Sequence, residues 1–527
     1  MAKKRNIAQA KNKKIPPATV APEAPVEEEK PKKGFTGEQW AVLGTLMISS
    51  FLGRLDGSIV SLATPKIITD FGITVTEASY ITTAYVLGNA VFVPVFGKLG
   101  DLIGRKPLYL FGIIGFVIAS ALAGLSWNLS SMLVFRVLQA ITVSIDYPIA
   151  LSIIAFEFTD RRQRLQAQGI WSSIFAAAIV FGPLLGGPLT DIFGWRSVFY
   201  VNIPLGAIGT FMALRYIKEP VAQIKGLKHF DWLGSIILGI SLAAMVLVLD
   251  RGQTWGWTSV KSIVSYIISA GSLAAFIFVE QREKEPVVDL NFFKIPTFTI
   301  ANAASFISMM GLFGGIFLIP IFAQNILGYS VTKSGYLFIP MAIGIMTGAQ
   351  VGVRLSQKLS PRYFVSVGML AASLIMFSFS GIDVKWGFWD IGLRLALFAF
   401  GIGVGFGPLT QAAVGTVPIE EVGVASSVLA LSRNLAGAFG TAIFATILSN
   451  SLTSSLINVQ NSSVINTTNP QQLQIIAGLI EVKATIMAYG SVFYWAAFFV
   501  IAGGITTIFL KDVKPHPGNK PSANIEA

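Results

Sequence analysis

Apolar segments of about 20 residues, separated by short polar ones, follow one another from Trp40 to Leu510. A helix of that length crosses the hydrocarbon core of a bilayer, so the pattern predicts an all-helical membrane protein. We predict fourteen spans, at residues 39–62, 79–97, 107–126, 129–152, 166–188, 195–217, 231–249, 262–280, 297–321, 333–353, 363–381, 387–412, 425–449 and 485–510.

The composition agrees with a membrane protein. Of the 527 residues, 53% are hydrophobic and 13% are charged, whereas a soluble domain carries about 25% charged residues. The chain has no cysteine, which excludes disulfides and thiolate metal sites. Its two histidines, His229 and His516, fall in polar connecting segments. We therefore expect no metal site and no group of residues that would make the protein an enzyme.

The net charge of +12 raises the question of nucleic-acid binding, which the distribution of the charges argues against. Lysine and arginine gather in alternate short loops, the positive-inside pattern of membrane proteins. These loops contain Lys98, Arg105, Lys106, Arg161, Arg162, Arg164, Arg215, Lys218, Lys225, Lys228, Arg282, Lys284, Lys294, Arg354, Lys358 and Arg362. We expect them on the cytoplasmic side of the cell (inner) membrane, together with both termini.

Residues 1–38 are rich in Lys, Ala, Pro and Glu and contain no apolar signal-peptide core. We interpret them as a disordered basic cytoplasmic tail; contact of their lysines with anionic lipid is the alternative. Residues 513–527 form a second cytoplasmic tail. The polar stretch NVQNSSVINTTNPQQLQ between the last two spans is expected outside the cell.

A charged motif follows the second span and recurs weakly in the second half of the chain. GKLGDLIGRK provides Gly97, Asp101, Gly104, Arg105 and Lys106, and GVRLSQKLSPR follows the tenth span. The glycines permit a tight turn and close helix packing, and Asp101 can lie at a helix end or pair with Arg105. We interpret the motif as a cytoplasmic latch. An internal repeat of this kind is typical of transporters, whose substrate site lies between the halves.

The chain resembles the major facilitator superfamily, and more narrowly its fourteen-helix drug:proton antiporters of the EmrB/QacA type. The stretches that carry the resemblance are the GKLGDLIGRK loop, LDGSIV, TAYVLGNAVFVP, FRVLQAITVSIDYP, FGPLLGGPL, DRGQTWGWTS, EPVVDLNFF and SRNLAGAFG. The resemblance implies a major facilitator fold with six-helix bundles at 39–218 and 295–512. Two inserted transmembrane helices would lie at 219–294.

FGPLLGGPL contains Gly182, Pro183, Gly186 and Gly187. Proline removes a backbone hydrogen bond and kinks a helix, and glycine lets a neighbouring helix approach. In the family this motif marks exporters that exchange protons. An ordinary kinked membrane helix is the alternative.

Asp56 lies inside the first span, where a charge costs at least ~3 kcal/mol on insertion scales. Burial raises the pKa of a carboxyl group and a nearby cation lowers it. A carboxyl group whose pKa is thereby held near neutral pH can load a proton on one side of the membrane and release it on the other. The resemblance assigns this role to Asp56. Arg54 lies about 200° around the helix from Asp56, and the sequence does not identify its partner.

Asp146 lies in the fourth span, where the family usually has an apolar residue. Gln139 is on nearly the same helix face, and Arg136, the family's buried arginine, lies within one turn of Gln139. We expect Asp146 to be a second protonation site or a counter-charge for cationic substrate, with Arg136 taking part in proton coupling. A structural pair of Asp146 with Arg54 or Arg136 is the alternative.

Arg433, in the thirteenth span, is interpreted as a gating residue or as a snorkelling anchor. The run GIGVGFGP at 401–408 lacks the context of a nucleotide loop, so we expect no ATP and no cofactor, with protons driving the protein. Polar and aromatic residues of the candidate substrate cavity are Tyr85, Asn89, Gln139, Trp171, Phe175, Gln324 and Gln411. Each of them alone fits packing as well as ligand contact.

The sequence therefore predicts a proton-coupled antiporter that exports hydrophobic, often cationic drugs by alternating access. Export of an endogenous lipid, siderophore or metabolite is the alternative within transporters. A sensor or assembly partner that has a transporter fold but does not transport is the second alternative. The expected partners are small substrates, protons and the lipid bilayer, and a periplasmic adaptor protein is a further candidate.

Overall fold

The computed structural model describes residues 34–218, 230–283, 285–463 and 469–511, which form helices and no strand. Within these ranges, the side chains of residues 61, 75–76, 161, 175–177, 179–180, 183, 314–317 and 331 are not described. The two predicted tails and both histidines lie outside the described residues, apart from the few residues next to the first helix.

The first half of the chain contains eight helices in the described residues. They are α1 (Gly37–Phe71), α2 (Val75–Ile103), α3 (Arg105–Gly124), α4 (Leu129–Val143), α5 (Asp146–Glu157), α6 (Arg161–Phe193), α7 (Ser197–Tyr200) and α8 (Asn202–Tyr216). Two helices follow as an inserted hairpin, α9 (Trp232–Trp255) and α10 (Val260–Glu280).

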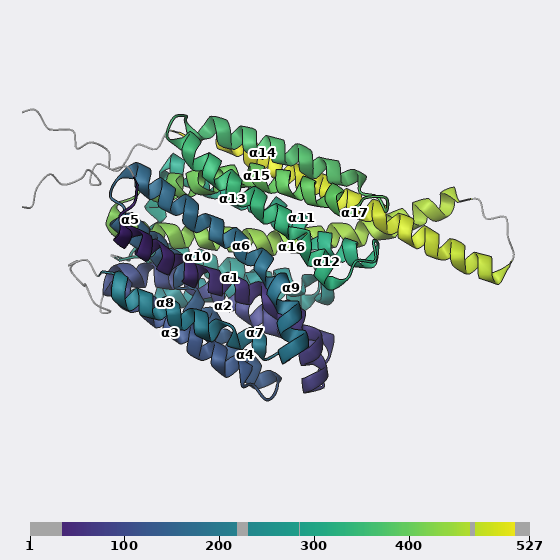
Figure 1. The fold of residues 1–527 in the computed structure, drawn as a ribbon, viewed down its shortest axis with the longest axis horizontal. Helices are drawn as coiled ribbons and strands as arrows, with labels where there is room; N and C mark the ends of the chain where they lie inside the picture. Colours follow the sequence, from purple (N-terminus) through teal and green to yellow (C-terminus); the bar gives the residue numbers. More distant parts are fainter. Residues whose placement is uncertain (1–33, 219–229, 284, 464–468, 512–527) are drawn as a thin grey trace, which may run out of the picture. The chain divides into compact units, whose positions relative to one another are not determined.

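The second half begins with a short 3₁₀ helix after the hairpin. Its elements are η2 (Leu290–Lys294), α11 (Pro296–Asn325), α12 (Val331–Tyr336), α13 (Phe338–Ser356), α14 (Pro361–Ser378), η3 (Phe379–Gly381), α15 (Phe388–Val414), η4 (Ile419–Glu421), α16 (Val422–Ser462) and α17 (Pro470–Ile508). Figure 1 shows the helices of the first half lying beside those of the second.

The described residues contain 12 helices that are long and apolar enough to span a membrane, and α1 adds a bent pair. The fifth predicted span, 166–188, lies in α6, a helix of 33 residues that does not meet the same test as a whole. The all-helical fold is confirmed. A count of fourteen spans is compatible with these helices and stays a prediction.

Two prolines explain where the first half departs from straight spans. Helix α1 bends by 58° between Val60 and Leu62, and Pro65 cannot donate to the carbonyl four residues earlier, at residue 61. The predicted span 129–152 lies within one candidate membrane span, Leu129–Glu157, which has a short break between α4 and α5. Pro148 removes the hydrogen bond to Ser144 at this break in the same way.

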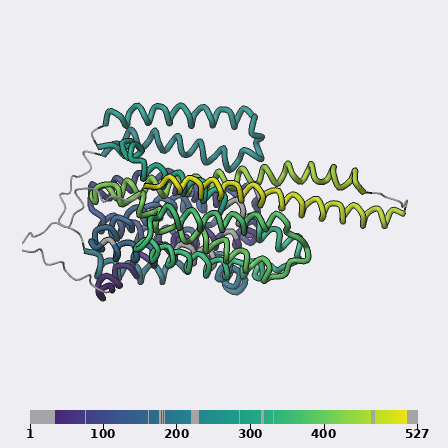
Figure 2. The backbone as a smooth tube through the Cα atoms, turned by 90° about the horizontal axis from the view of Figure 1, so that it is seen from above, coloured from purple at the N-terminus to yellow at the C-terminus, as the bar shows by residue number. Residues whose placement is uncertain are grey.

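Helices α16 and α17 are far longer than the predicted spans 425–449 and 485–510. They contain 41 and 39 residues, or about 60 Å each at 1.5 Å per residue, against about 30 Å of hydrocarbon. Figure 1 and Figure 2 show them running past the other helices as a pair. Much of the polar stretch that we expected between two spans is therefore helical.

The inserted hairpin lies along one side of the two halves (Figure 2). Helix α9 packs against α10, against α2 of the first half and against α16 of the second. The halves also meet directly, α2 with α16, α5 with α16 and α6 with α13. The hairpin therefore contacts both halves at one of these seams.

Candidate functional site

Asp56 on α1 and Arg136 on α4 form an ion pair inside the first half. The Arg136 Nη1 atom donates to Asp56 Oδ2 at 2.5 Å, and the two residues are 0% and 1% exposed. Breaking a buried pair by removing one partner leaves an uncompensated charge, which costs about 3–5 kcal/mol. Removal of either charge would therefore abolish the attraction between α1 and α4 at this point.

Two amide side chains complete the shell of Asp56. Gln139 Nε2 and Asn202 Nδ2 donate to Asp56 Oδ1 at 3.1 and 3.0 Å. Gln139 also accepts from Arg136 at 2.9 Å and donates to Ser120 at 2.8 Å. The carboxylate thus joins α1, α4 and α8, with α3 contacting it through Ser120.

The sequence reasoning missed Asn202 and Ser120. Neither is charged, and a single amide or hydroxyl in an apolar stretch is weak evidence of function. The available signal was Asn202 itself, a polar residue that is rarely buried, in the apolar run VNIPLGAIG. Gln139, which we predicted for the substrate cavity, contacts Asp56, Arg136 and Ser120 in this cluster.

Tyr85 on α2 covers the ion pair. The guanidinium carbon of Arg136 lies 4.1 Å from the centre of the Tyr85 ring, a cation–π contact. The Tyr85 hydroxyl donates to the carbonyl of Gly53 on α1 at 2.8 Å. Helix α2, which meets the second half, is therefore in direct contact with the Asp56 cluster.

Asp146 begins α5 and has different neighbours. Ser50 Oγ donates to Asp146 Oδ2 at 2.6 Å, and Trp171 Nε1 donates to Ser50 Oγ at 2.8 Å. Arg136 pairs with Asp56, so the predicted alternative of an Asp146–Arg136 pair is wrong. Although Gln139 and Asp146 were placed on one face, the break between α4 and α5 separates their contacts.

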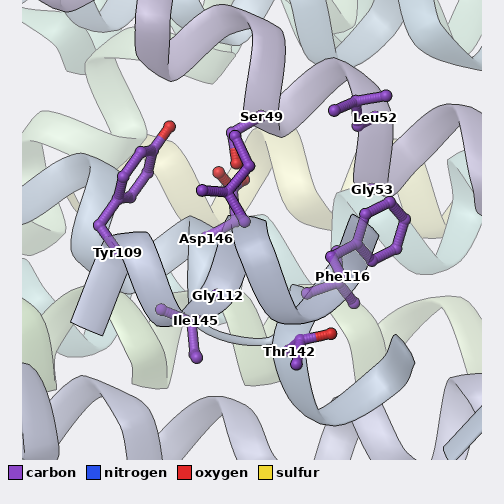
Figure 3. Close-up of a pocket in the computed structure, with 11 residues that line it drawn as sticks. Ser49, Leu52, Gly53, Tyr109, Gly112, Phe116, Thr142, Ile145 and Asp146 are labelled. Atoms are coloured by element: carbon purple, nitrogen blue, oxygen red, sulfur yellow. The ribbon is translucent and has the colours of Figure 1, made fainter. Parts of the chain in front are cut away.

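A small cavity lies beside Asp146 (Figure 3). It is lined in part by Ser49, Gly53, Tyr109, Thr142 and Asp146. Its volume of about 10 Å³ has room for roughly one water molecule. Hydroxyl and carboxylate groups on its wall give such a water polar partners.

Arg54 lies on the Asp146 side of α1. It lies close enough to Asp146 to be attracted by the carboxylate and close enough to Arg433 to be repelled by the guanidinium. The two charges of α1 therefore have different partners, Arg136 for Asp56 and Asp146 for Arg54. This agrees with their positions on opposite faces of the helix.

Arg433 on α16 connects the two halves. Its Nη1 atom donates to the hydroxyl of Tyr147 on α5 at 2.8 Å, and Nη2 donates to Thr410 on α15 at 3.1 Å. The Tyr147 ring lies 5.2 Å from that of Trp171, centre to centre. A continuous series of contacts thus runs from Asp146 to the second half. These contacts are compatible with a gating role of Arg433, which stays a prediction.

The predicted latch contacts the start of α16. The backbone N–H of Val424 donates to Asp101 Oδ2 at 3.3 Å, and an acid near a helix N-terminus is favourable. A Cβ on Gly97 would lie 2.8 Å from the carbonyl oxygen of Gly423, so the glycine permits a close approach of α2 and α16. Asp101, expected at a helix end or paired with Arg105, thus lies against the other half.

Arg105 and Lys106 add contacts of different kinds. Arg105 donates to the carbonyl of Ile419, just before α16, at 3.1 Å, whereas Lys106 donates to the carbonyl of Leu214 within the first half at 3.1 Å. Gly104, with φ 100°, is in a conformation that favours glycine and ends α2. Gly97, Asp101 and Arg105 thus contact the second half at this end of the molecule, whereas Lys106 does not.

The antiporter motif packs on α1 beside Asp56. A Cβ on Gly182 would lie 2.0 Å from Ser58 Oγ, and one on Gly186 would lie 2.8 Å from Ile59. A Cβ on Gly187 would make only an ordinary van der Waals contact, with Thr332 Oγ1 at 3.9 Å. Helix α6 continues through Pro183, whose side chain is outside the described part.

The predicted substrate residues do not gather around one described cavity. Asn89 accepts from Asn434 on α16 at 2.9 Å, another contact between the halves. Trp171 and Tyr85 pack as described above, Gln411 is buried on α15, and Gln324 is half-buried near the end of α11. The Phe175 side chain is outside the described residues. The cavity assignments stay predictions.

Comparison with known proteins places the chain in a family. The sequence model of the Major Facilitator Superfamily matches residues 46–441. The chain is 31% identical to the multidrug transporter protein MdtP of Bacillus subtilis (strain 168), over 92% of this chain and 95% of that protein. It is 28% identical to the multidrug export protein EmrB of Escherichia coli (strain K12), over 83% and 86%. It is also 28% identical to the tetracenomycin C resistance and export protein of Streptomyces glaucescens, over 79% and 77%.

The fold is similar to the crystal structure of the human organic anion transporter MFSD10 (TETRAN). The TM-score is 0.58 and the identity 14%, with coverage of 90% of this chain and 100% of that chain. At this identity the likeness concerns the fold alone. Since the family match covers most of the sequence and the helices are those of a multi-pass membrane protein, this chain is a transporter of the Major Facilitator Superfamily.

Proposed function

We propose that this protein is a proton-coupled antiporter that exports hydrophobic, often cationic drugs across the cell membrane. The observation that carries the proposal is the Asp56 cluster, an acid buried among Arg136, Gln139 and Asn202 on three helices. The multidrug names of the relatives support the substrate class. Protons are the driving ion, and no cofactor takes part.

Protonation of Asp56 changes what its neighbours can do. The carboxylate accepts three hydrogen bonds, from Arg136, Gln139 and Asn202. A proton on either oxygen removes the negative charge and one acceptor position, which leaves Arg136 buried and poorly paired. The first half then relaxes to a different packing of α1, α4 and α8.

Contacts of these helices transmit the change to the other half. Tyr85 covers Arg136 from α2, and the latch holds α2 on α16. Gly182 and Ser58 bring α6 against α1 two residues from Asp56, and α6 packs on α13 of the second half. Loss of the ion pair therefore acts on both seams between the halves, as alternating access requires.

Asp146 provides a second acid close to the seam. Its contacts reach Arg433 through Ser50, Trp171 and Tyr147. A positive charge on a substrate between the halves would be attracted to it. We propose Asp146 as a second protonation site or as the counter-charge for cationic substrates.

The energy source is sufficient for such a cycle. One proton that moves down 100 mV releases about 2.3 kcal/mol before any pH difference is added. We place the latch on the cytoplasmic side with both termini, because the basic loops lie at that end of the spans. In the structure described here the latch is closed.

Ethidium efflux from membrane vesicles tests the proposal. Vesicles with the wild-type protein should extrude the dye until a protonophore is added, and Asp56→Asn should abolish extrusion at equal expression. Glu481→Gln is the matched control, because it neutralises an exposed acid on α17. Efflux of native lipid extracts in place of dyes would instead support export of an endogenous compound. Dye extrusion that continues with the protonophore would overturn proton coupling.

A further inference from the structure

Two acids at the base of the inserted hairpin are not used by the transport mechanism above. Asp231 caps the start of α9, and Glu280 is the last residue of α10. They are 7% and 3% exposed. A buried charge is costly unless it is paired, so each carboxylate requires a partner.

One oxygen of each acid has a backbone donor. Asp231 Oδ1 accepts from the N–H of Gly234 at 2.8 Å. Glu280 Oε1 accepts from the N–H of Val288 at 2.6 Å. Glu280 therefore fastens the loop that leads into the second half to the base of the hairpin.

The other two oxygens, Asp231 Oδ2 and Glu280 Oε2, are buried and have no hydrogen-bond donor among the residues that the structure describes. They converge on one place, since a Cβ added to Gly234 would lie 2.0 Å from the first and 2.9 Å from the second. The two side chains are within hydrogen-bonding reach of each other. Two acceptors that face each other in this way lack one hydrogen between them.

Among residues 34–218, 230–283 and 285–463, the nearby cations have other partners. Lys98 pairs with Glu285 at 2.7 Å, and Arg282 stacks on Phe278 at 3.6 Å. Asp231 is the largest charge that acts on Glu280. Of the acids on adjoining elements, Glu421 interacts with Asp289 and with the Lys98–Glu285 pair.

We propose that Asp231 and Glu280 form a binding site for a single proton, shared between Oδ2 and Oε2 and separate from Asp56. Two carboxylates in close contact cannot both stay ionised in a buried site, and one proton converts their repulsion into a hydrogen bond. This site does not depend on the proposed drug export.

The site lies where it can act on the latch. The loop that Glu280 holds at Val288 also carries Glu285, the partner of Lys98. Lys98 belongs to the latch motif on α2. Loss of the shared proton separates the two acids, frees this loop from α10 and weakens the connection of the hairpin to the latch.

Infrared spectra of the purified full-length protein in lipid nanodiscs test the proposal. The wild-type protein should show the carbonyl band of a protonated carboxylic acid, and Glu280→Gln should remove one such acid from the difference spectrum. The glutamine amide can donate to Asp231 Oδ2 and still accept from Val288, so this variant should fold. Asp231→Asn is the second variant, since asparagine retains the helix cap.

Thermal unfolding at several pH values gives an independent readout. The folded pair holds a proton that the separate acids of the unfolded chain release at lower pH. Its contribution to stability is therefore present at low pH and lost as the pH rises. The midpoint of the wild type should fall at high pH, and that part of the fall should be absent in Glu280→Gln.

The outcomes separate this site from the proposed function. Asp56→Asn should abolish transport and leave the band of the pair in place. Loss of one protonated acid in either folded hairpin variant supports the shared proton. A wild-type spectrum without a protonated carboxylic acid, or variants with the wild-type band and pH profile, would overturn it.

Discussion

The hydroxyl of Tyr147 accepts a hydrogen bond from Arg433 at 2.8 Å, and this bond joins α5 of the first half to α16 of the second. The ring of Tyr147 also packs on Trp171, whose indole N–H reaches Ser50 beside Asp146. A change at Asp146 in the first half can thus reach Arg433 in the second half through these contacts.

Removal of this bond should shift the protein away from the described conformation. A hydrogen bond to a charged group contributes about 1.5–3 kcal/mol, so Tyr147→Phe should raise the population of the alternative state about tenfold or more. Ser427→Cys gives the readout. This residue is buried against Gly97 at the latch, and the chain has no other cysteine. Its labelling by a thiol reagent should become faster.

Tyr363→Phe is the control for that experiment. Tyr363 accepts a similar bond from its neighbour Arg362 at 2.6 Å, on an exposed helix end within one half. Its loss should leave the labelling rate unchanged. Equal rates in Tyr147→Phe and the wild type would show that the Tyr147–Arg433 bond does not hold the halves together.

The Asp56–Arg136 pair should be strongly coupled in stability. Asp56→Asn and Arg136→Met each leave one buried charge without its partner, with an expected loss of about 3–5 kcal/mol. The double variant removes both charges and should lose much less than the sum. Thermal unfolding in detergent measures this double-mutant cycle. Additive losses would mean that the pair is not coupled.

The glycines of the antiporter motif should differ in their tolerance of alanine. Gly182→Ala places a methyl group 2.0 Å from Ser58 Oγ, and overpacking of this kind costs about 1–3 kcal/mol. Gly187→Ala meets nothing closer than 3.9 Å and serves as the matched control. Vesicle efflux should fall for the first variant only. A wild-type rate for Gly182→Ala would refute a close α1–α6 contact during transport.

Asp146→Asn should retain the fold, because an asparagine oxygen can still accept from Ser50, and should lose the exchangeable proton. We expect export of cationic dyes to fall several-fold, with a smaller effect on neutral compounds. Parallel efflux assays and proton-uptake measurements check this. Full drug export together with full proton coupling in this variant would remove Asp146 from the mechanism.

The helices were predictable because apolar length is a strong signal. The acids proposed for proton coupling could be singled out because a charge inside an apolar span is rare. Asp56 and Arg136 were thus identified from the sequence, although their direct contact depends on the packing of α1 and α4. The two irregularities within the predicted spans of the first half lie near prolines. Pro65 and Pro148 were visible in the sequence, but the bend and the break they cause were not assigned.

The remaining site residues could not be predicted because their role depends on tertiary contacts. Asn202 and Ser120 are ordinary polar residues until α8 and α3 bring them to the carboxylate. Asp231 and Glu280 are 49 positions apart, and the hairpin brings them together. The great length of α16 and α17 was missed because the outer part of α16 is rich in Ser and Asn. The outer part of α17 begins with PQQLQ, and Glu481 and Lys483 interrupt its apolar run.

The most direct test of the account is uphill ethidium transport in proteoliposomes that are energised only by an imposed pH gradient. The wild-type protein and Glu481→Gln should concentrate the dye, and a protonophore should stop both. Asp56→Asn should not concentrate the dye, although it is reconstituted in the same liposomes at the same density. Uphill transport by Asp56→Asn at the wild-type rate, or wild-type transport that persists after the gradient has collapsed, would contradict proton coupling through Asp56.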